Sequence, residues 1–189
     1  MCDRVALVSV PQLREVPAFG PRPIGLEELF AFWRSAVAHG FADRMARPVC
    51  PQRRGFDYAF RYTGDRNLEY CEEFAGALRW SGDELIVHDF DRPMWRLSLH
   101  GACEPWLIDE ETRDPILVQE APARLREALN ECRREPDGFA PRGPLIHRMD
   151  MWLYRCRWEG SFEEFHGSET LSHNGTTVLR AHFHGGLIL

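Results

Sequence analysis

The feature that most constrains the fold is a short pattern that occurs twice in the chain. In the first copy, residues 80–84 (WSGDE) are followed by residues 96–101 (RLSLHG); in the second, residues 165–169 (FHGSE) are followed by residues 180–185 (RAHFHG). The copies lie 85 residues apart at the first element and 84 at the second, so only the turn between the elements differs in length. This spacing predicts two duplicated modules about a pseudo-two-fold axis, with a pocket at their seam.

The second copy contains the strongest hairpin signal in the chain, Asn174-Gly175 between two β-rich segments. Asn-Gly favours a two-residue type I′ turn, in which His173 would pair with Thr176. Because side chains alternate across a sheet, this register would place one set of residues together on one face. The expected pairs are Leu171 with Val178, Glu169 with Arg180, Gly167 with His182 and Phe165 with His184.

A three-residue loop at 89–91 would give the first hairpin the same arrangement. The expected pairs are Ile86 with Met94, Glu84 with Arg96, Gly82 with Ser98 and Trp80 with His100. Each module would then present an aromatic residue, a glycine, a glutamate, an arginine and a histidine on one face. A glycine opposite a polar residue leaves a space beside these side chains.

Helical periodicity precedes each copy of the pattern. Apolar residues recur at helical spacing over residues 26–37, and a second helix is expected to begin at Pro122 and to end before 136–138. Strands are expected at 4–10, 58–62, 70–74 and 150–158, in addition to the two hairpins.

These elements predict an α+β fold of two duplicated helix-plus-antiparallel-strand modules that share one core. The expected divisions are an N-terminal strand and proline-rich segment (1–25), a first module (26–103), an acidic connector (104–120) and a second module (121–189).

Composition excludes several classes of function. The net charge of -6 argues against a nucleic-acid partner, because phosphate binding requires clustered positive charge. All 23 basic residues are arginine, which excludes lysine Schiff-base chemistry and a Walker-type phosphate loop. The six scattered cysteines favour reduced thiols and a cytoplasmic location, and no apolar run reaches membrane-spanning length.

The clustered residues allow three interpretations. In the first, Glu84–Arg96 and Glu169–Arg180 are cross-strand ion pairs with a purely structural role. In the second, the face lines a pocket for a small, partly aromatic ligand. In the third, His182, His184 and Glu169 bind iron or zinc in an oxygenase or hydrolase.

We expect first a small-molecule-binding protein, or a cofactor-free enzyme, that acts on an aromatic or cyclic metabolite. Glu84 or Glu169 would transfer the proton, and His182 or His184 would assist as acid or base. The ligand-binding residues would be Trp80, Arg96, His100, Phe165 and Arg180. No cofactor, membrane or nucleic acid is expected as a partner; a homodimer that serves only as an interaction module is the remaining alternative.

These motifs resemble DUF5680, a bacterial and archaeal domain family of unknown function. The stretches that carry the resemblance are 70–76, 79–84, 93–95, 100–101, 159–160, 165–169 and 183–186. The similarity runs from about Leu26 to the end of the chain and implies no reaction. The family commonly has Tyr where this chain has His100, which leaves open a specialised role such as tailoring a secondary metabolite.

Overall fold

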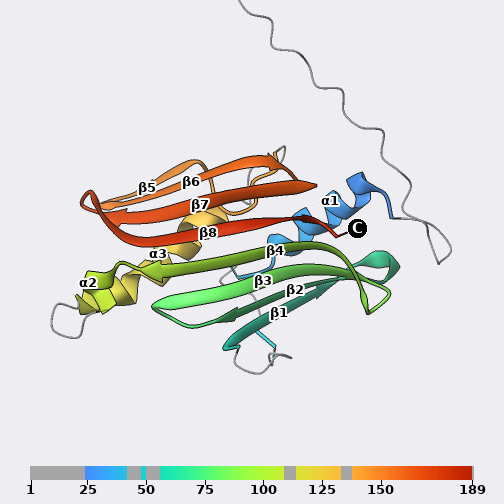
Figure 1. Cartoon of the computed structure of the whole chain (residues 1–189), viewed down its shortest axis with the longest axis horizontal. Coiled ribbons are helices and arrows are strands. Elements are labelled where there is room, and N and C mark those ends of the chain that lie inside the picture. Colours follow the sequence, from blue (N-terminus) through green and yellow to red (C-terminus); the bar gives the residue numbers. More distant parts are fainter. Residues whose placement is uncertain (1–23, 42–47, 50–55, 109–113, 133–137, 189) are drawn as a thin grey trace, which may run out of the picture.

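The fold is built on one antiparallel sheet of eight strands in the order β1-β2-β3-β4-β8-β7-β6-β5 (Figure 1). The computed structural model describes residues 24–41, 48–49, 56–108, 114–132 and 138–188. The strands are β1 (Tyr58–Thr63), β2 (Leu68–Ala75), β3 (Arg79–His88), β4 (Arg92–Cys103), β5 (Ile146–Met149), β6 (Trp152–Ser161), β7 (Glu164–His173) and β8 (Thr176–Leu187). The helices are α1 (Leu26–Val37), α2 (Pro105–Ile108) and α3 (Pro115–Cys132), with a 3-10 turn at Asp65–Asn67.

The prediction of two helix-plus-antiparallel-strand modules packed about a pseudo-two-fold axis is wrong, because the strands of both halves form a single continuous sheet. β1–β4 and β5–β8 each make four adjacent strands, and the halves join where β4 pairs with β8 from Trp95–Leu187 to Cys103–Leu179. Without this pairing, β4 and β8 would be exposed edge strands with unsatisfied backbone groups. Joining them satisfies those groups and makes the sheet, rather than a helix-strand unit, the basis of the fold.

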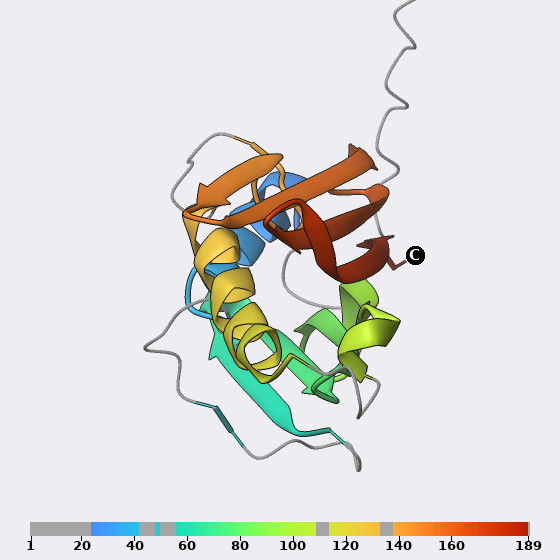
Figure 2. The ribbon, with the colours of Figure 1, turned by 90° about the vertical axis from the view of Figure 1, so that its left-hand side faces the viewer.

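The sheet curves around α1 and α3, which lie on its concave side (Figure 2). α1 buries Leu29, Trp33 and Ala36, which recur at helical spacing, as the sequence predicted. The ring of Trp33 lies 5.8 Å from that of Trp95 on β4, so α1 packs against the middle of the sheet. The concave face is therefore the buried face, and polar groups on it need partners within the protein.

The second helix begins earlier than predicted. α3 starts at Pro115, where Asp114 Oδ1 accepts hydrogen bonds from the backbone N–H groups of Ile116 and Leu117. This cap places Pro122 inside the helix instead of at its first turn. α2 and the start of α3 thus occupy the segment expected to be an acidic connector, and the strand expected at 4–10 lies outside the described residues.

The two turns are confirmed, but the registers predicted from them are wrong. Asn174 and Gly175 have φ angles of 48° and 81°, and His173 pairs with Thr176. A β-bulge between Leu171 and Ser172 then shifts every later pair by one residue. The first hairpin keeps its turn at 89–91 and has a matching bulge between Ile86 and Val87.

When the register shifts by one residue, each side chain of one strand shares its face with the residues of the partner strand that were expected on the opposite face. Glu169 pairs with Ala181 instead of Arg180, and Phe165 pairs with Gly185 instead of His184. In the first hairpin the pairs are Glu84 with Leu97, Gly82 with Leu99 and Trp80 with Gly101. Both glutamates and both aromatic residues face the helices, whereas the arginines and histidines expected beside them lie on the other face of the sheet.

Candidate functional site

The arginines expected to pair with Glu84 and Glu169 lie on the outer face of the sheet. Arg96 Nη2 is 2.7 Å from Asp83 Oδ1, and Arg180 Nε is 2.7 Å from Glu104 Oε1. The expected Glu84–Arg96 and Glu169–Arg180 ion pairs are therefore not formed. Neither arginine is placed to hold a ligand group beside the two glutamates.

The histidines of the pattern also lie on the outer face. His100, His182 and His184 are exposed, and the rings of His100 and His182 stack at 5.6 Å. Because Glu169 is buried on the opposite face, it cannot complete a metal site with His182 and His184. Within the part of the chain that the structure describes, no group of three or more His, Cys, Asp or Glu residues is placed to hold a metal ion.

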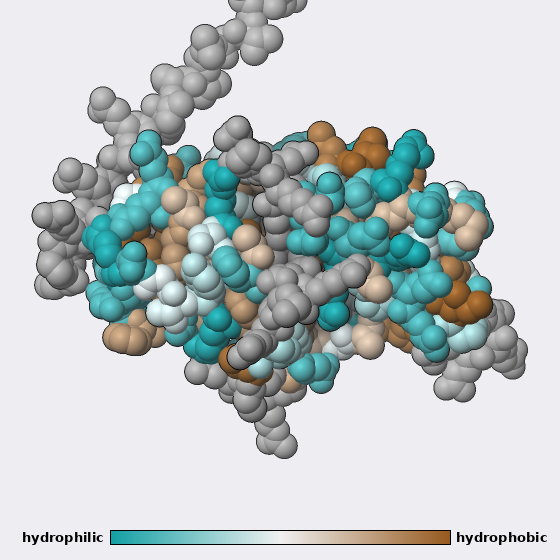
Figure 3. Space-filling model, turned by 180° about the vertical axis from the view of Figure 1, so that it is seen from behind, coloured by the Kyte–Doolittle hydropathy of each residue, from teal (hydrophilic) through white to brown (hydrophobic). Residues whose placement is uncertain are grey.

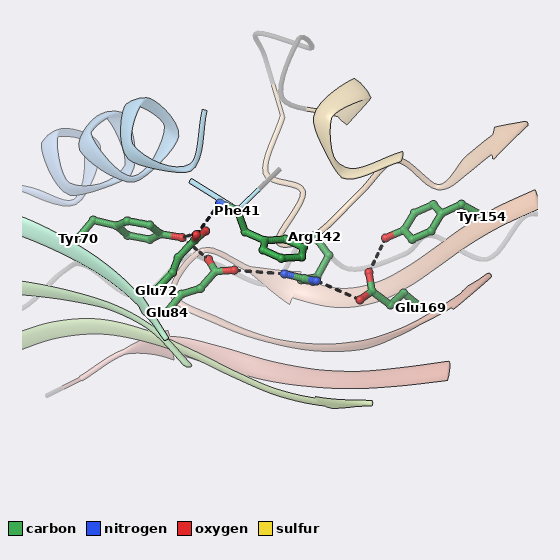
Figure 4. Close-up of polar contacts among 7 residues, drawn as sticks. All are labelled: Phe41, Tyr70, Glu72, Glu84, Arg142, Tyr154 and Glu169. Carbon is green, nitrogen blue, oxygen red and sulfur yellow. Dashed lines mark hydrogen bonds and ion pairs between the residues drawn. The ribbon is translucent and has the colours of Figure 1, made fainter. Parts of the chain in front are cut away.

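The concave face holds a buried polar cluster centred on Arg142 (Figure 4). Arg142 Nη1 donates to Glu84 Oε1 at 3.3 Å, and Nη2 donates to Glu169 Oε1 at 3.1 Å. The hydroxyl of Tyr154 donates to the other oxygen of Glu169 at 2.7 Å. One guanidinium thus joins a carboxyl group from each half of the sheet, with all of these side chains in the interior.

The cluster has a second branch on β2. Tyr70 Oη lies 2.8 Å from Glu72 Oε1 and 2.8 Å from Glu84 Oε2. A phenol has one hydrogen to donate, so both contacts are hydrogen bonds only if one carboxyl group supplies a second hydrogen. The backbone N–H of Phe41 donates to Glu72 Oε2 at 2.6 Å. The branch therefore anchors the segment after α1 to the sheet.

Burial and charge act in opposite directions on Arg142. Burial by itself lowers the pKa of the guanidinium, but the nearby Glu169 and Glu84 carboxyl groups outweigh it and hold the pKa above its usual value. Burial, followed by the charge of Glu169, raises the pKa of Tyr154 well above its usual value. Arg142 thus remains a cation and Tyr154 remains a neutral hydrogen-bond donor.

Arg142 lies in residues 138–145, an irregular segment that leads into β5. The next residue is Gly143, where an added Cβ would lie 2.5 Å from Tyr154 Oη. A residue with a side chain at 143 would therefore displace the phenol that binds Glu169. Glycine is needed here because the ring and hydroxyl of Tyr154 approach the backbone at this position closely.

Arg142 also lines a cavity of about 330 Å³ between α3 and the β1–β4 half of the sheet. Its other walls are mostly apolar and aromatic, from elements far apart in the sequence; they include Phe41, Phe74, Trp80, Ala121 and Leu125. Asp57 and Arg126 line it as well and are exposed, so they mark the side that approaches solvent. Only Trp80 of the expected ligand-binding residues contributes to this cavity.

The corresponding part of the β5–β8 half is filled by aromatic rings. Phe165, which occupies on β7 the position of Trp80 on β3, has its ring 5.0 Å from that of Phe139 and 5.7 Å from that of Trp95. Phe139 in turn lies 5.9 Å from Phe162. Among the described residues, the two halves therefore differ at this position: Phe165 is surrounded by aromatic rings, whereas Trp80 lines the cavity.

The outer face of the β1–β4 half carries a second hollow, of about 700 Å³, but its walls include the charged side chains of Asp83 and Arg96, so it suits an aromatic ligand less well than the cavity does. On the side of the molecule where α1 and α3 lie, hydrophilic residues cover most of the described surface, and hydrophobic residues lie in separate patches (Figure 3). Single apolar side chains on a surface are ordinary and need no functional explanation. The candidate site is therefore the cavity together with Arg142.

Sequence reasoning missed Arg142, Tyr154, Tyr70 and Glu72. Arg142 stands in a Pro-Arg-Gly-Pro segment without periodicity, so its neighbours along the chain do not indicate that it is buried. The available signal was the two-residue spacing of Tyr70 and Glu72 within a predicted strand, because residues two apart in a strand point to the same face. Once that face is buried, its carboxyl groups require a cation or another donor.

Comparison with known proteins identifies a family for the chain but no activity. No curated protein matches the chain, and no solved structure matches it. The model of the domain of unknown function DUF5680 matches residues 72–188, which begin on β2 and include Glu84, Arg142 and Glu169. This match covers more than half of the sequence and starts later than the resemblance at about Leu26 suggested. The chain therefore belongs to the DUF5680 family.

Proposed function

We propose that this protein binds a small aromatic or cyclic molecule in the cavity between α3 and the β1–β4 half of the sheet. The observation that carries the proposal is an apolar cavity of about 330 Å³ with a buried guanidinium in its wall. Small-molecule sites are typically apolar cavities of roughly 300–1,000 Å³ with a few fixed polar groups. This cavity is at the small end of that range, which suits a bicyclic compound or one of similar size.

The difference between the two halves supports this proposal. Protein interiors are packed at a density of about 0.75, and an apolar void lowers stability because its walls lose contacts. The β5–β8 half fills the corresponding space with Phe139, Phe162 and Phe165, so the fold can accommodate a packed arrangement there. A space maintained at this position, where the equivalent position of the other half holds aromatic rings, is consistent with a ligand that completes the packing.

Binding is better supported than catalysis by the glutamates. Neither Glu84 nor Glu169 is among the residues that line the cavity, since Arg142 lies between them and it. The proton-transfer role expected for these carboxyl groups would require the substrate to reach past Arg142. We therefore assign them to positioning Arg142.

We also propose that the two halves arose by duplication, as the repeated pattern indicates. The arrangement of groups supports this, because Tyr70 with Glu84 in one half corresponds to Tyr154 with Glu169 in the other. The two halves meet where β4 pairs with β8, and Leu99 with Phe183 is the central pair of that contact. On this proposal the cavity is a later difference between once-similar halves.

The test of binding uses two variants of α3. Ala121 is fully buried and lines the cavity, so Ala121→Phe should fill it. Ala123 is exposed on the same helix, so Ala123→Phe is the matched control. A panel of neutral and acidic bicyclic compounds is screened by unfolding temperature and equilibrium dialysis. We expect some of the panel to bind the unaltered protein and the control but not Ala121→Phe; equal binding to all three proteins would refute the site.

A further inference from the structure

We infer that the ligand is a neutral aromatic or alicyclic compound that carries a single hydrogen-bond acceptor, such as a ketone oxygen, and that this acceptor binds Arg142. The inference rests on the proposed function, since it specifies which compounds the same cavity accepts. It differs from the sequence-based expectation, in which Arg96 and Arg180 would hold an anionic group.

The first argument is an unused donor. Both Nη atoms of Arg142 donate to carboxyl groups, at 3.3 Å to Glu84 and 3.1 Å to Glu169. Its Nε is buried and has no hydrogen-bond partner among the residues that the structure describes. A buried N–H without an acceptor is unfavourable, and more so on a charged group. Because Arg142 lines the cavity, a ligand acceptor beside it would remove that penalty once a small shift of the side chain turns the buried Nε toward the ligand.

The second argument is charge. Arg142 carries one positive charge and already contacts the carboxyl groups of Glu84 and Glu169. A carboxylate ligand would bring a third carboxyl group to the same guanidinium, in an interior where like charges repel strongly. The ligand would also lose its hydration on entering an apolar cavity. A neutral oxygen accepts the Nε hydrogen without this repulsion.

The third argument concerns the remaining walls. A cation on the buried side of the cavity would meet the positive guanidinium of Arg142, because Glu84 and Glu169 do not line the cavity. The two other charged residues of the lining, Asp57 and Arg126, are exposed on the side that approaches solvent. The aromatic walls, which include Phe41, Phe74 and Trp80, favour a flat or cyclic body. A neutral ring system with one acceptor satisfies all three features together.

The test compares three compounds of one size on the unaltered protein: 2-acetylnaphthalene, 2-ethylnaphthalene and 2-naphthoate. They share a ring system and present a neutral acceptor, no acceptor and an anionic acceptor. Substituting Arg142 is avoided because it would leave two buried carboxyl groups without their cation. Dissociation constants are measured by equilibrium dialysis, with Ala121→Phe as the filled-cavity control.

We expect the ketone to bind about tenfold or more tightly than the hydrocarbon, which is the effect of one hydrogen bond to a charged donor. We expect the carboxylate to bind more weakly than the ketone, and Ala121→Phe to weaken all three. Equal binding of ketone and hydrocarbon, or tightest binding by the carboxylate, would overturn this inference and leave the cavity proposal intact. Failure of all three to bind would overturn the cavity proposal and this inference with it.

Discussion

The guanidinium of Arg142 and the carboxyl group of Glu169 form an ion pair with Nη2 3.1 Å from Oε1, and neither side chain is more than 4% exposed. The two residues come from a loop after α3 and from β7, so the pair exists only in the folded chain. Arg142 also pairs with Glu84 on β3, in the other half of the sheet. One buried cation thus connects both halves of the sheet. Of the three charged residues that line the cavity, Arg142 is buried, whereas Asp57 and Arg126 are exposed.

Glu169→Gln should lower the free energy of unfolding by about 3 kcal/mol, because it leaves a buried guanidinium with one fewer carboxylate. The control is Glu159→Gln on β6, whose side chain is 86% exposed. This control should change stability by less than about 0.5 kcal/mol. Urea unfolding of the two variants provides the comparison, and similar losses in both would contradict a special role for the buried pair.

Tyr70→Phe should destabilise the protein by about 1–3 kcal/mol, because it removes a buried hydroxyl that contacts both Glu72 and Glu84. The matched control is Tyr62→Phe on the neighbouring strand. Tyr62 pairs directly with Tyr70, but its hydroxyl contacts Ser35 in an exposed position at 2.9 Å. Chemical unfolding should show a clearly smaller loss for the control; the reverse order would show that the buried contacts contribute little.

Gly40→Ala should destabilise the protein by about 1–3 kcal/mol, because an added Cβ would lie 2.4 Å from Glu72 Oε1. Glu72 cannot move freely, since it is fully buried and bound by Tyr70 and by the backbone of Phe41. Gly138→Ala is the control, because no atom of the residues that the structure describes lies within 4 Å of an added Cβ there. Thermal unfolding that gives the same midpoint for both variants would argue against this close approach.

Stability should fall as the pH rises above about 9, and Cys156 should account for part of the loss. Burial, and next the charge of Glu169, raises the pKa of the Cys156 thiol from 9.0 to about 12. Between these two values the unfolded chain releases the thiol proton while the folded chain retains it, so alkali favours unfolding.

The measurement is urea unfolding of the unaltered protein and of Cys156→Ala at pH 8, 9 and 10. The variant should lose less stability with rising pH than the unaltered protein, whatever its stability at pH 8. Parallel pH profiles for the two proteins would contradict the assignment to Cys156.

Replacing both outer-face histidines, His182→Ala with His184→Ala, should leave ligand binding unchanged and stability within about 0.5 kcal/mol. Both side chains are exposed on the face opposite Arg142 and the cavity. Equilibrium dialysis and thermal unfolding test this expectation. A loss of binding in the double variant would indicate that the ligand binds at the outer face of the sheet and not in the cavity.

No helix among the described residues is long and apolar enough to cross a membrane. Cys71, Cys103 and Cys156 are free thiols, as the scattered cysteine spacing predicted. These outcomes depend on composition and spacing, which can be evaluated without knowing which strands pair.

Local sequence determined the parts of the structure that depend on local interactions. α1 follows from apolar residues at helical spacing over 26–37, and the Asn174-Gly175 turn follows from two residues that accept positive φ angles. The pairing of His173 with Thr176 follows from the Asn174-Gly175 turn, and the first hairpin keeps its predicted loop at 89–91. In these cases the energetic preference is contained within a few neighbouring residues.

Only the tertiary structure decided what surrounds Glu84 and Glu169. Each bulge adds one residue to the second strand of its hairpin, Met94 on β4 and Val178 on β8. Arg96 and Arg180 consequently lie on the face opposite the buried Glu84 and Glu169. A bulge is favoured when it directs the correct side chains into the core, so it depends on the whole sheet and its helices. The pairing of β4 with β8 and the approach of Arg142 likewise join segments far apart in the chain, whose energies no local pattern contains.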